Sequence, residues 1–155
     1  MIVDPIRREE FTASRGRGAS LNGRRIRVSK NQQLGGSLIG TGIPFRAQQK
    51  QYIDDYVNCL KAVAGQMAGI RRAGSAALDL AYVAAGRLDG FWELSLTPGD
   101  LAAGMLLIQE AGGLVSDFTG GNSCLDTGNI VCGNPKVFKQ LLQVVNANLK
   151  PTAAS

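Results

Sequence analysis

Histidine is entirely absent from this sequence of 155 residues. Its absence excludes histidine-based catalytic triads, histidine-ligated zinc sites and imidazole pH switches. Any chemistry must therefore rest on carboxylates, hydroxyls, backbone amides, basic side chains or thiols. Cysteine is scarce as well, with Cys59, Cys124 and Cys132 as the whole set and no Cys-x-x-Cys pair. The odd number argues against a closed disulfide framework and favours reduced thiols.

Long apolar runs are also missing. No stretch of the sequence approaches the roughly 20 residues that a helix needs to cross a bilayer. The first residues lack the basic segment and apolar core of a targeting peptide. We therefore expect a cytoplasmic protein that does not associate with membranes. The hydrophobic content of 45% and the charged content of 19% are those of an ordinary globular domain.

Positive charge is concentrated near the start of the sequence. The net charge is +5, and the first thirty residues contain Arg7, Arg8, Arg15, Arg17, Arg24, Arg25, Arg27 and Lys30. Such a patch suits an anionic partner such as nucleic acid or phosphate. Phe11 is the one aromatic residue in this region, and no RNA-binding signature accompanies it. A solvated surface of strands and turns is therefore the alternative interpretation.

The order of the hydrophobic patterns predicts hairpins followed by alternating strands and helices. Residues 10–29 are expected to form two or three antiparallel strands, with a hairpin turn at Asn22-Gly23. Further strands are expected at 37–41, 70–72, 89–94, 114–117 and 129–132, and helices at 48–66, 76–85, 98–111 and 135–149. This order indicates the α/β class, as a layered α+β fold in which an antiparallel piece joins an α/β layer.

Asp100 has the sequence context of a site residue. It follows Thr97-Pro98-Gly99 at the start of a predicted helix, where free N–H groups and the helix dipole favour a carboxylate. This position suits a residue that holds a hard cation facing a phosphate, and simple helix capping is the alternative. Glu93 precedes Asp100 at a strand end, and we expect it to face the same strand-to-helix crevice.

Gly74-Ser75-Ala76 is a second candidate, because a glycine turn there opens a helix of small residues. Free N–H groups at such a turn can hold an anion or a sugar hydroxyl. Glycine also marks ordinary strand-to-helix turns, so a purely structural turn is the alternative. We interpret Asp79 and Asp89 as structural residues, and Cys132 as a buried core residue.

These segments resemble one protein family along nearly the whole chain. The run from Gly74 to Glu93 is similar to the second half of the inositol monophosphatases, in particular their bacterial extragenic-suppressor branch. Further matches are Phe11-Thr12-Ala13, Gly16-Arg17-Gly18-Ala19, Leu21-Asn22-Gly23, Asp100-Leu101-Ala102-Ala103-Gly104, Glu110-Ala111-Gly112-Gly113, Thr119-Gly120-Gly121 and Gly128-Asn129-Ile130-Val131.

The resemblance implies the C-terminal portion of a layered α-β-α-β-α fold. Residues 1–36 would be strands of an incomplete antiparallel sheet, residues 37–150 the α/β layer and residues 151–155 a frayed tail. It further implies Mg²⁺-dependent, Li⁺-sensitive hydrolysis of phosphate monoesters such as inositol 1-phosphate. By matching position, Asp100 would be a metal ligand that also contacts an inositol hydroxyl. The substrate would be lined by Gly74, Ser75, Ala76 and Glu93.

Two departures from the family pattern bear on activity. The family's N-terminal half, with its Glu-Glu segment and Asp-Pro-x-Asp-Gly-Thr motif, is not represented, because Asp4-Pro5-Ile6 is followed by Arg7-Arg8. Mg²⁺ commonly needs more than one carboxylate, so Asp100 alone would leave the isolated chain inactive. Gly99 stands where the family usually has Trp, which removes an aromatic wall and adds backbone freedom beside Asp100.

Two alternatives to a phosphatase remain open. The first is a non-catalytic binding protein, because bacterial relatives of this branch are associated with the RNA-transcription machinery and the basic first thirty residues suit such a partner. The second possibility is a degenerate gene fragment without function. In every case we expect self-association, because an incomplete sheet exposes an unpaired edge and an apolar face.

Overall fold

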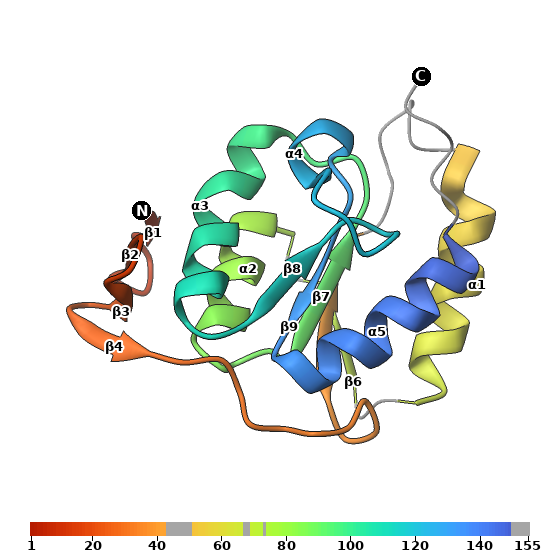
Figure 1. Ribbon diagram of the computed structural model, residues 1–155, viewed down its shortest axis with the longest axis horizontal. Coiled ribbons are helices and arrows are strands. Elements are labelled where there is room, and N and C mark those ends of the chain that lie inside the picture. The colour runs from red at the N-terminus through yellow and green to blue at the C-terminus, as the bar shows by residue number, and fades with distance from the viewer. Residues whose placement is uncertain (43–50, 67–68, 73, 150–155) are drawn as a thin grey trace.

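The computed structural model describes residues 1–42, 51–66, 69–72 and 74–149. Two β-sheets and five helices alternate in layers, as Figure 1 shows. The α/β layered class expected from the sequence is thus confirmed. Among the described residues, no helix is long and apolar enough to span a membrane.

The first sheet is antiparallel and follows chain order. Its strands are β1 (Ile2–Asp4), β2 (Glu9–Ser14), β3 (Gly18–Leu21) and β4 (Arg24–Ile26). The predicted hairpin at Asn22-Gly23 is present, with positive φ angles of 50° and 79° at these two residues. Beyond the two or three strands expected within residues 10–29, β1 adds a further strand by pairing Ile2 with Phe11.

The second sheet is mixed. Its order is β6–β5–β7–β9–β8, from β5 (Leu38–Thr41), β6 (Gly69–Arg71), β7 (Gly90–Glu93), β8 (Leu114–Ser116) and β9 (Ile130–Gly133). Strands β5, β6 and β7 are parallel, whereas β9 is antiparallel to both β7 and β8. The parallel strands are joined by helices, as parallel connections require.

The helices are α1 (Ile53–Ala64), α2 (Ala76–Ala84), α3 (Pro98–Glu110), α4 (Cys124–Thr127) and α5 (Pro135–Asn148). Four of them match predicted helices, and the short α4 was not predicted. Of the helix expected at 48–66, the first residues up to 50 lie outside the described residues, and Gln51 and Tyr52 form a 3₁₀ turn before α1. The predicted tail at 151–155 lies outside them as well.

Strand β7 shows how the layers are held together. Successive side chains point to opposite faces of a sheet, so Phe91 packs with α2 and α3 while Trp92 packs with α1 and α5. Phe11 and Ala19 of the first sheet belong to the same core as Phe91. Helices α2 and α3 therefore lie between the two sheets, and the layer order is β-α-β-α.

Asp89 holds the connection between the two sheets in place. Its carboxylate accepts hydrogen bonds from the Ser29 hydroxyl at 2.5 Å and from the Leu38 N–H at 2.7 Å. These contacts agree with the structural role expected for Asp89. The three cysteines are free and buried, and burial raises the pKa of the Cys132 thiol well above its usual range. Cys132 is thus core, as expected.

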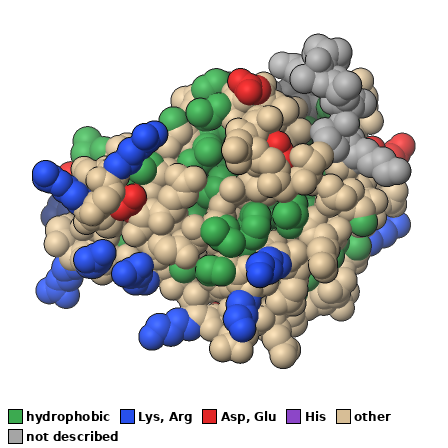
Figure 2. Space-filling view, in the orientation of Figure 1, with side chains coloured by type: hydrophobic (Ala, Val, Ile, Leu, Met, Phe, Trp, Pro, Cys, Tyr) green, Lys and Arg blue, Asp and Glu red, His purple; other side chains and the backbone are tan. Residues whose placement is uncertain are grey.

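The basic residues of the first thirty positions all lie on the surface. In Figure 2, Lys and Arg side chains project around the part of the molecule that contains the first sheet. The uneven charge distribution of the sequence is therefore an exposed feature of the fold.

Candidate functional site

The topology places the predicted site residues along one edge of the second sheet. Gly74 and Ser75 follow β6, Glu93 ends β7, and Asp100 lies in the first turn of α3, the helix that follows β7. Because β5, β6 and β7 run parallel, their carboxyl ends share an edge, the upper edge of the sheet in Figure 1. This edge is the usual ligand position in open α/β sheets.

The turn at Gly74 opens α2 as the sequence predicted. Gly74 has a φ of +85°, a conformation that favours glycine, and a Cβ there would meet open space. Ser75 is the N-cap, and its hydroxyl accepts a hydrogen bond from the Leu78 N–H at 3.4 Å. The hydroxyl of Ser75 thus serves the helix, while the remaining N–H groups of the first turn stay available to a ligand.

Asp100 is held in a capping box. The Thr97 hydroxyl oxygen accepts from the Asp100 N–H at 3.3 Å, and Asp100 Oδ2 accepts from the Thr97 N–H at 3.3 Å and the Thr97 hydroxyl at 2.7 Å. Thr97 is therefore the N-cap, and Asp100 is the third helical residue. The two hydrogen bonds that the carboxylate accepts both end on Oδ2, so Oδ1 can face a hydroxyl or a cation.

Gly99 is the residue expected to add backbone freedom beside Asp100. Gly99 lies inside the first turn of α3, between Pro98 and Asp100. The capping box holds Thr97 and Asp100 on either side of it. A Cβ added to Gly99 would have its nearest neighbour, Thr97 Oγ1, 3.9 Å away, so the position has room for a side chain.

Glu93 is positioned by a glycine that sequence reasoning missed. A Cβ on Gly42 would lie 1.8 Å from Glu93 Oε1 and 2.2 Å from its Cδ, so the Glu93 carboxylate packs directly against the Gly42 backbone. Gly42 follows β5, and Glu93 ends the neighbouring β7. The Gly40-Thr41-Gly42 run at the end of a buried strand is the sequence feature that could have indicated such a close approach.

The loop between Glu93 and Asp100 is supported from α4. Ser95 has a positive φ of 57°, uncommon for a residue other than glycine, and its N–H donates to Asn129 Oδ1 at 3.1 Å. The Leu96 N–H donates to the Gly128 carbonyl at 2.8 Å, and a Cβ on Gly128 would lie 2.3 Å from the Leu96 carbonyl oxygen. The turn at Gly128 and Asn129 thus fixes the loop that spaces the two acids.

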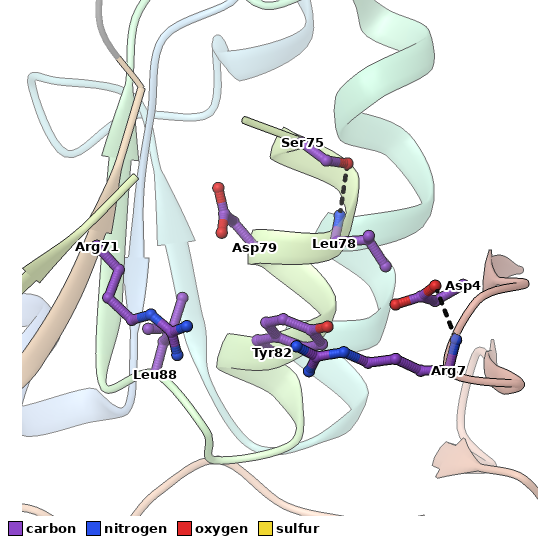
Figure 3. A pocket seen from close by; sticks show the side chains of 8 residues that line it. All are labelled: Asp4, Arg7, Arg71, Ser75, Leu78, Asp79, Tyr82 and Leu88. Carbon is purple, nitrogen blue, oxygen red and sulfur yellow. Dashed lines mark hydrogen bonds between the residues drawn. The ribbon is translucent and has the colours of Figure 1, made fainter. Parts of the chain in front are cut away.

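A pocket of about 200 Å³ lies beside α2 and shares Ser75 with the predicted site (Figure 3). Its lining consists of Asp4, Arg7, Arg71, Ser75, Leu78, Asp79, Tyr82 and Leu88. Asp79 is only 2% exposed, and its Oδ1 is buried without a hydrogen-bond partner in the described part of the chain. Burial raises the pKa of Asp79 to about 7, against the opposing charge of Arg71.

The described residues do not make a magnesium site by themselves. No group of three or more Asp, Glu, Cys or His side chains among them is placed to hold a metal ion. Asp100 offers a single carboxylate oxygen, and Mg²⁺ requires near-octahedral oxygen ligands. The residues present thus do not fit the ion that the family implies, unless acidic groups come from outside this chain.

Comparison with known proteins identifies the family. Residues 1–150 match the inositol monophosphatase family. The chain belongs to this family. It is 60% identical to the Nus factor SuhB of Pseudomonas aeruginosa over an alignment of 152 residues. This alignment covers 98% of this chain and 56% of that protein. It is 56% identical over 142 residues to the Nus factor SuhB of Escherichia coli K12, with 92% and 52% covered.

Solved structures of family members have the same fold. The extragenic suppressor protein SuhB of Bartonella henselae superposes with a TM-score of 0.89 at 45% identity, covering 95% of this chain and 55% of that one. The inositol monophosphatase of Anabaena gives 0.87 at 36% identity, covering 95% and 60%. The chain therefore spans about half the length of the relatives it matches.

Proposed function

We propose that this chain is the substrate-side half of a Mg²⁺-dependent phosphatase for phosphate monoesters such as inositol 1-phosphate, and that it is inactive alone. The proposal is supported by the shared sheet edge that carries Gly74–Ala76, Glu93 and Asp100. Inactivity of the isolated chain is supported by Asp100 being the one carboxylate assigned to the metal, since the described residues contain no acidic cluster for a metal ion.

Each group on this edge has a chemical role in the proposal. The N–H groups of the first turn of α2, with the helix dipole, attract the anionic end of a substrate. Glu93, held against Gly42, accepts hydrogen bonds from substrate hydroxyls. Asp100 Oδ1 accepts from a further hydroxyl or ligates a cation. The other carboxylates of the metal site come from a polypeptide outside this chain.

The first experiment uses the purified chain alone. Phosphate release from inositol 1-phosphate is measured with and without Mg²⁺, and we expect no Mg²⁺-dependent turnover. Turnover close to that of a full-length relative, abolished by Asp100→Asn, would contradict the predicted inactivity.

The second experiment supplies the other half in trans. The part of the Pseudomonas SuhB relative that this chain does not cover is expressed separately and mixed with the chain. We expect Mg²⁺-dependent hydrolysis to appear with the parent chain and to be lost with Asp100→Ala. Asp55→Ala, on the exposed side of α1, is the matched control and should leave the activity unchanged. Equal activity of the parent and Asp100→Ala mixtures would refute the role of Asp100.

A non-catalytic association with the RNA-transcription machinery is the second candidate. Two observations favour it: relatives carry the name Nus factor, and the basic residues of the first thirty positions are exposed in and around the first sheet. Binding of a labelled RNA oligonucleotide, followed by anisotropy at several salt concentrations, tests the anionic-partner interpretation. Arg24→Glu with Arg25→Glu should weaken binding, whereas an unchanged affinity would count against it.

A further inference from the structure

Charged groups from three elements converge on the pocket beside α2. Asp4 and Arg7 come from the end of β1 and the turn after it, Arg71 ends β6, and Asp79 lies within α2. Figure 3 shows the guanidinium groups of Arg7 and Arg71 approaching the pocket from opposite sides, near Tyr82 and Leu88. Neither Glu93 nor Asp100 lines this pocket. The pocket thus adjoins the proposed catalytic edge at Ser75, and a ligand bound among Arg7, Arg71 and Asp79 needs neither of the two acids of that edge.

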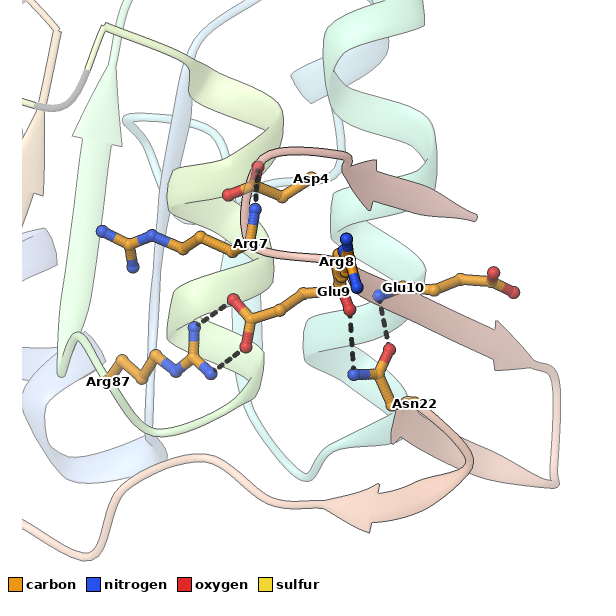
Figure 4. Close-up of polar contacts among 7 residues, drawn as sticks. All are labelled: Asp4, Arg7, Arg8, Glu9, Glu10, Asn22 and Arg87. Carbon is orange, nitrogen blue, oxygen red and sulfur yellow. Dashed lines mark hydrogen bonds and ion pairs between the residues drawn. The ribbon is translucent and has the colours of Figure 1, made fainter.

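The acids around the pocket leave these two arginines unpaired. Glu9 forms its ion pair with Arg87, and Asp4 Oδ1 accepts from the backbone N–H groups of Ile6 at 3.1 Å and Arg7 at 3.3 Å (Figure 4). The Arg7 guanidinium stacks over the Tyr82 ring at 5.8 Å. Within the part of the chain that the structure describes, no ion pair involves Arg7 or Arg71. The pocket lining therefore carries two guanidinium groups that can face an anion, beside the carboxylates of Asp4 and Asp79.

The Asp79 carboxylate places a second requirement on a ligand of this pocket, namely a hydrogen-bond donor. Its carboxylate is buried, and Oδ1 has no hydrogen-bond partner among the described residues. An ionised carboxylate can only accept hydrogen bonds. A buried polar group without a partner is uncommon in folded proteins and calls for a donor. A ligand that suits both the arginines and an ionised Asp79 is therefore an anion that also carries a hydrogen-bond donor.

We propose that this pocket binds inorganic phosphate in its protonated form, with Arg7 and Arg71 facing the negative charge and the Asp79 carboxylate accepting a hydrogen bond from the P–OH group. Hydrogen phosphate keeps one proton at neutral and mildly alkaline pH. Sulfate has the same shape and no proton there, so its oxygen atoms are repelled by the carboxylate. A phosphate monoester, with a second pKa of about 6, has also lost this proton at pH 8.

The test compares these anions on the complete chain. Binding is followed by ¹H–¹⁵N NMR titration at pH 8 and constant ionic strength, with EDTA present and no Mg²⁺. We expect saturable shifts around Asp79, Arg7 and Arg71 with inorganic phosphate. The affinities for sulfate and glycerol phosphate should be at least about tenfold lower than for inorganic phosphate. A loss of this size is expected when one charge-assisted hydrogen bond is missing. Equal affinities for phosphate and sulfate would overturn the proposal, as would shifts that never saturate.

Variants assign the selectivity to its residues. Asp79→Asn should abolish the preference for phosphate over sulfate, because the amide can donate an N–H to either anion. Arg71→Met, at an exposed position, should weaken both anions, whereas Arg24→Met on the first sheet is the matched control and should change neither. Asp100→Asn should leave phosphate binding intact, which separates this site from the catalytic edge. A preference that survives Asp79→Asn would overturn the assignment.

Discussion

Asp79 should make the stability of this protein depend on pH. Burial raises its pKa to about 7 in the folded chain, while an unfolded Asp titrates at about 3.9. Between these two values the folded state binds more protons than the unfolded state, so the free energy of unfolding falls as pH rises. Above pH 7 both states are ionised at this residue, and its contribution no longer changes.

The magnitude follows from the shift. Each pKa unit corresponds to about 1.4 kcal/mol, so ionisation of buried Asp79 costs on the order of 4 kcal/mol between pH 4 and pH 7. That is a substantial part of the roughly 5–15 kcal/mol by which domains are stable. Asp79 shares its pocket with Arg71 of β6, Asp4 at the end of β1 and Arg7 of the turn after it, and it interacts electrostatically with Cys132 of β9. Of these, Arg71 partly offsets the cost of ionisation.

The assay is urea unfolding in phosphate-free buffers from pH 5 to pH 8. Trp92 is fully buried and is the single tryptophan of the chain, so its fluorescence reports the transition. The parent should lose about 1.4 kcal/mol per pH unit between pH 5 and pH 6.5. Asp79→Asn should flatten this slope, and the exposed Asp126→Asn should keep it. Parallel curves for the parent and Asp79→Asn would refute the reasoning.

Two further predictions concern packing and association. A Cβ on Gly104 would lie 2.5 Å from Leu80 Cδ1, so Gly104→Ala should lower the free energy of unfolding in urea by about 1–3 kcal/mol. A Cβ on Gly99 would meet nothing nearer than Thr97 Oγ1 at 3.9 Å, so Gly99→Ala should raise it by up to about 1 kcal/mol through helix propensity. Equal effects of the two substitutions would contradict this. Because the described chain leaves one edge of β1 unpaired, sedimentation should show self-association that Val3→Lys reduces. A parent that stays monomeric at all concentrations would count against it.

Features encoded in neighbouring residues were predictable from the sequence. Asn22-Gly23 forms the expected hairpin because both residues accept positive φ. The helix starts at Ser75 and near Asp100 followed from cap residues and glycine turns. The common crevice of Glu93 and Asp100 was expected from the alternation of strands and helices, whereas Gly74 was placed with them only by the family resemblance.

Features that depend on distant contacts were not predictable in this way. The close approach of Gly42 to Glu93 joins two strands that are far apart in the sequence. The support of the Ser95 loop by Asn129 likewise depends on tertiary packing. Asp79 was interpreted as structural, because the sequence cannot show that its Oδ1 lacks a partner among the described residues. A period-3.6 pattern places a residue on a helix face, but it does not identify the atoms opposite that face.

We expect this chain to fold and yet to be inactive, because folding and catalysis require different kinds of contact. Both hydrophobic cores form from this chain's own residues, with α2 and α3 between the sheets and α1 and α5 on the far side. Apolar burial is non-directional and distributed over many side chains, so part of a larger protein can retain it. A metal site needs a few carboxylates in one geometry, and the described residues do not assemble them.

Asp100 contributes to folding and, in the proposed function, to catalysis. Its Oδ2 closes the capping box of α3, and such a cap stabilises a helix by about 0.5–2 kcal/mol whether or not a metal ion is bound. Its presence in the sequence is therefore explained by folding alone. Only an effect of Asp100 on catalysis in the reconstituted pair, larger than its effect on the stability of the chain, would assign it the second role.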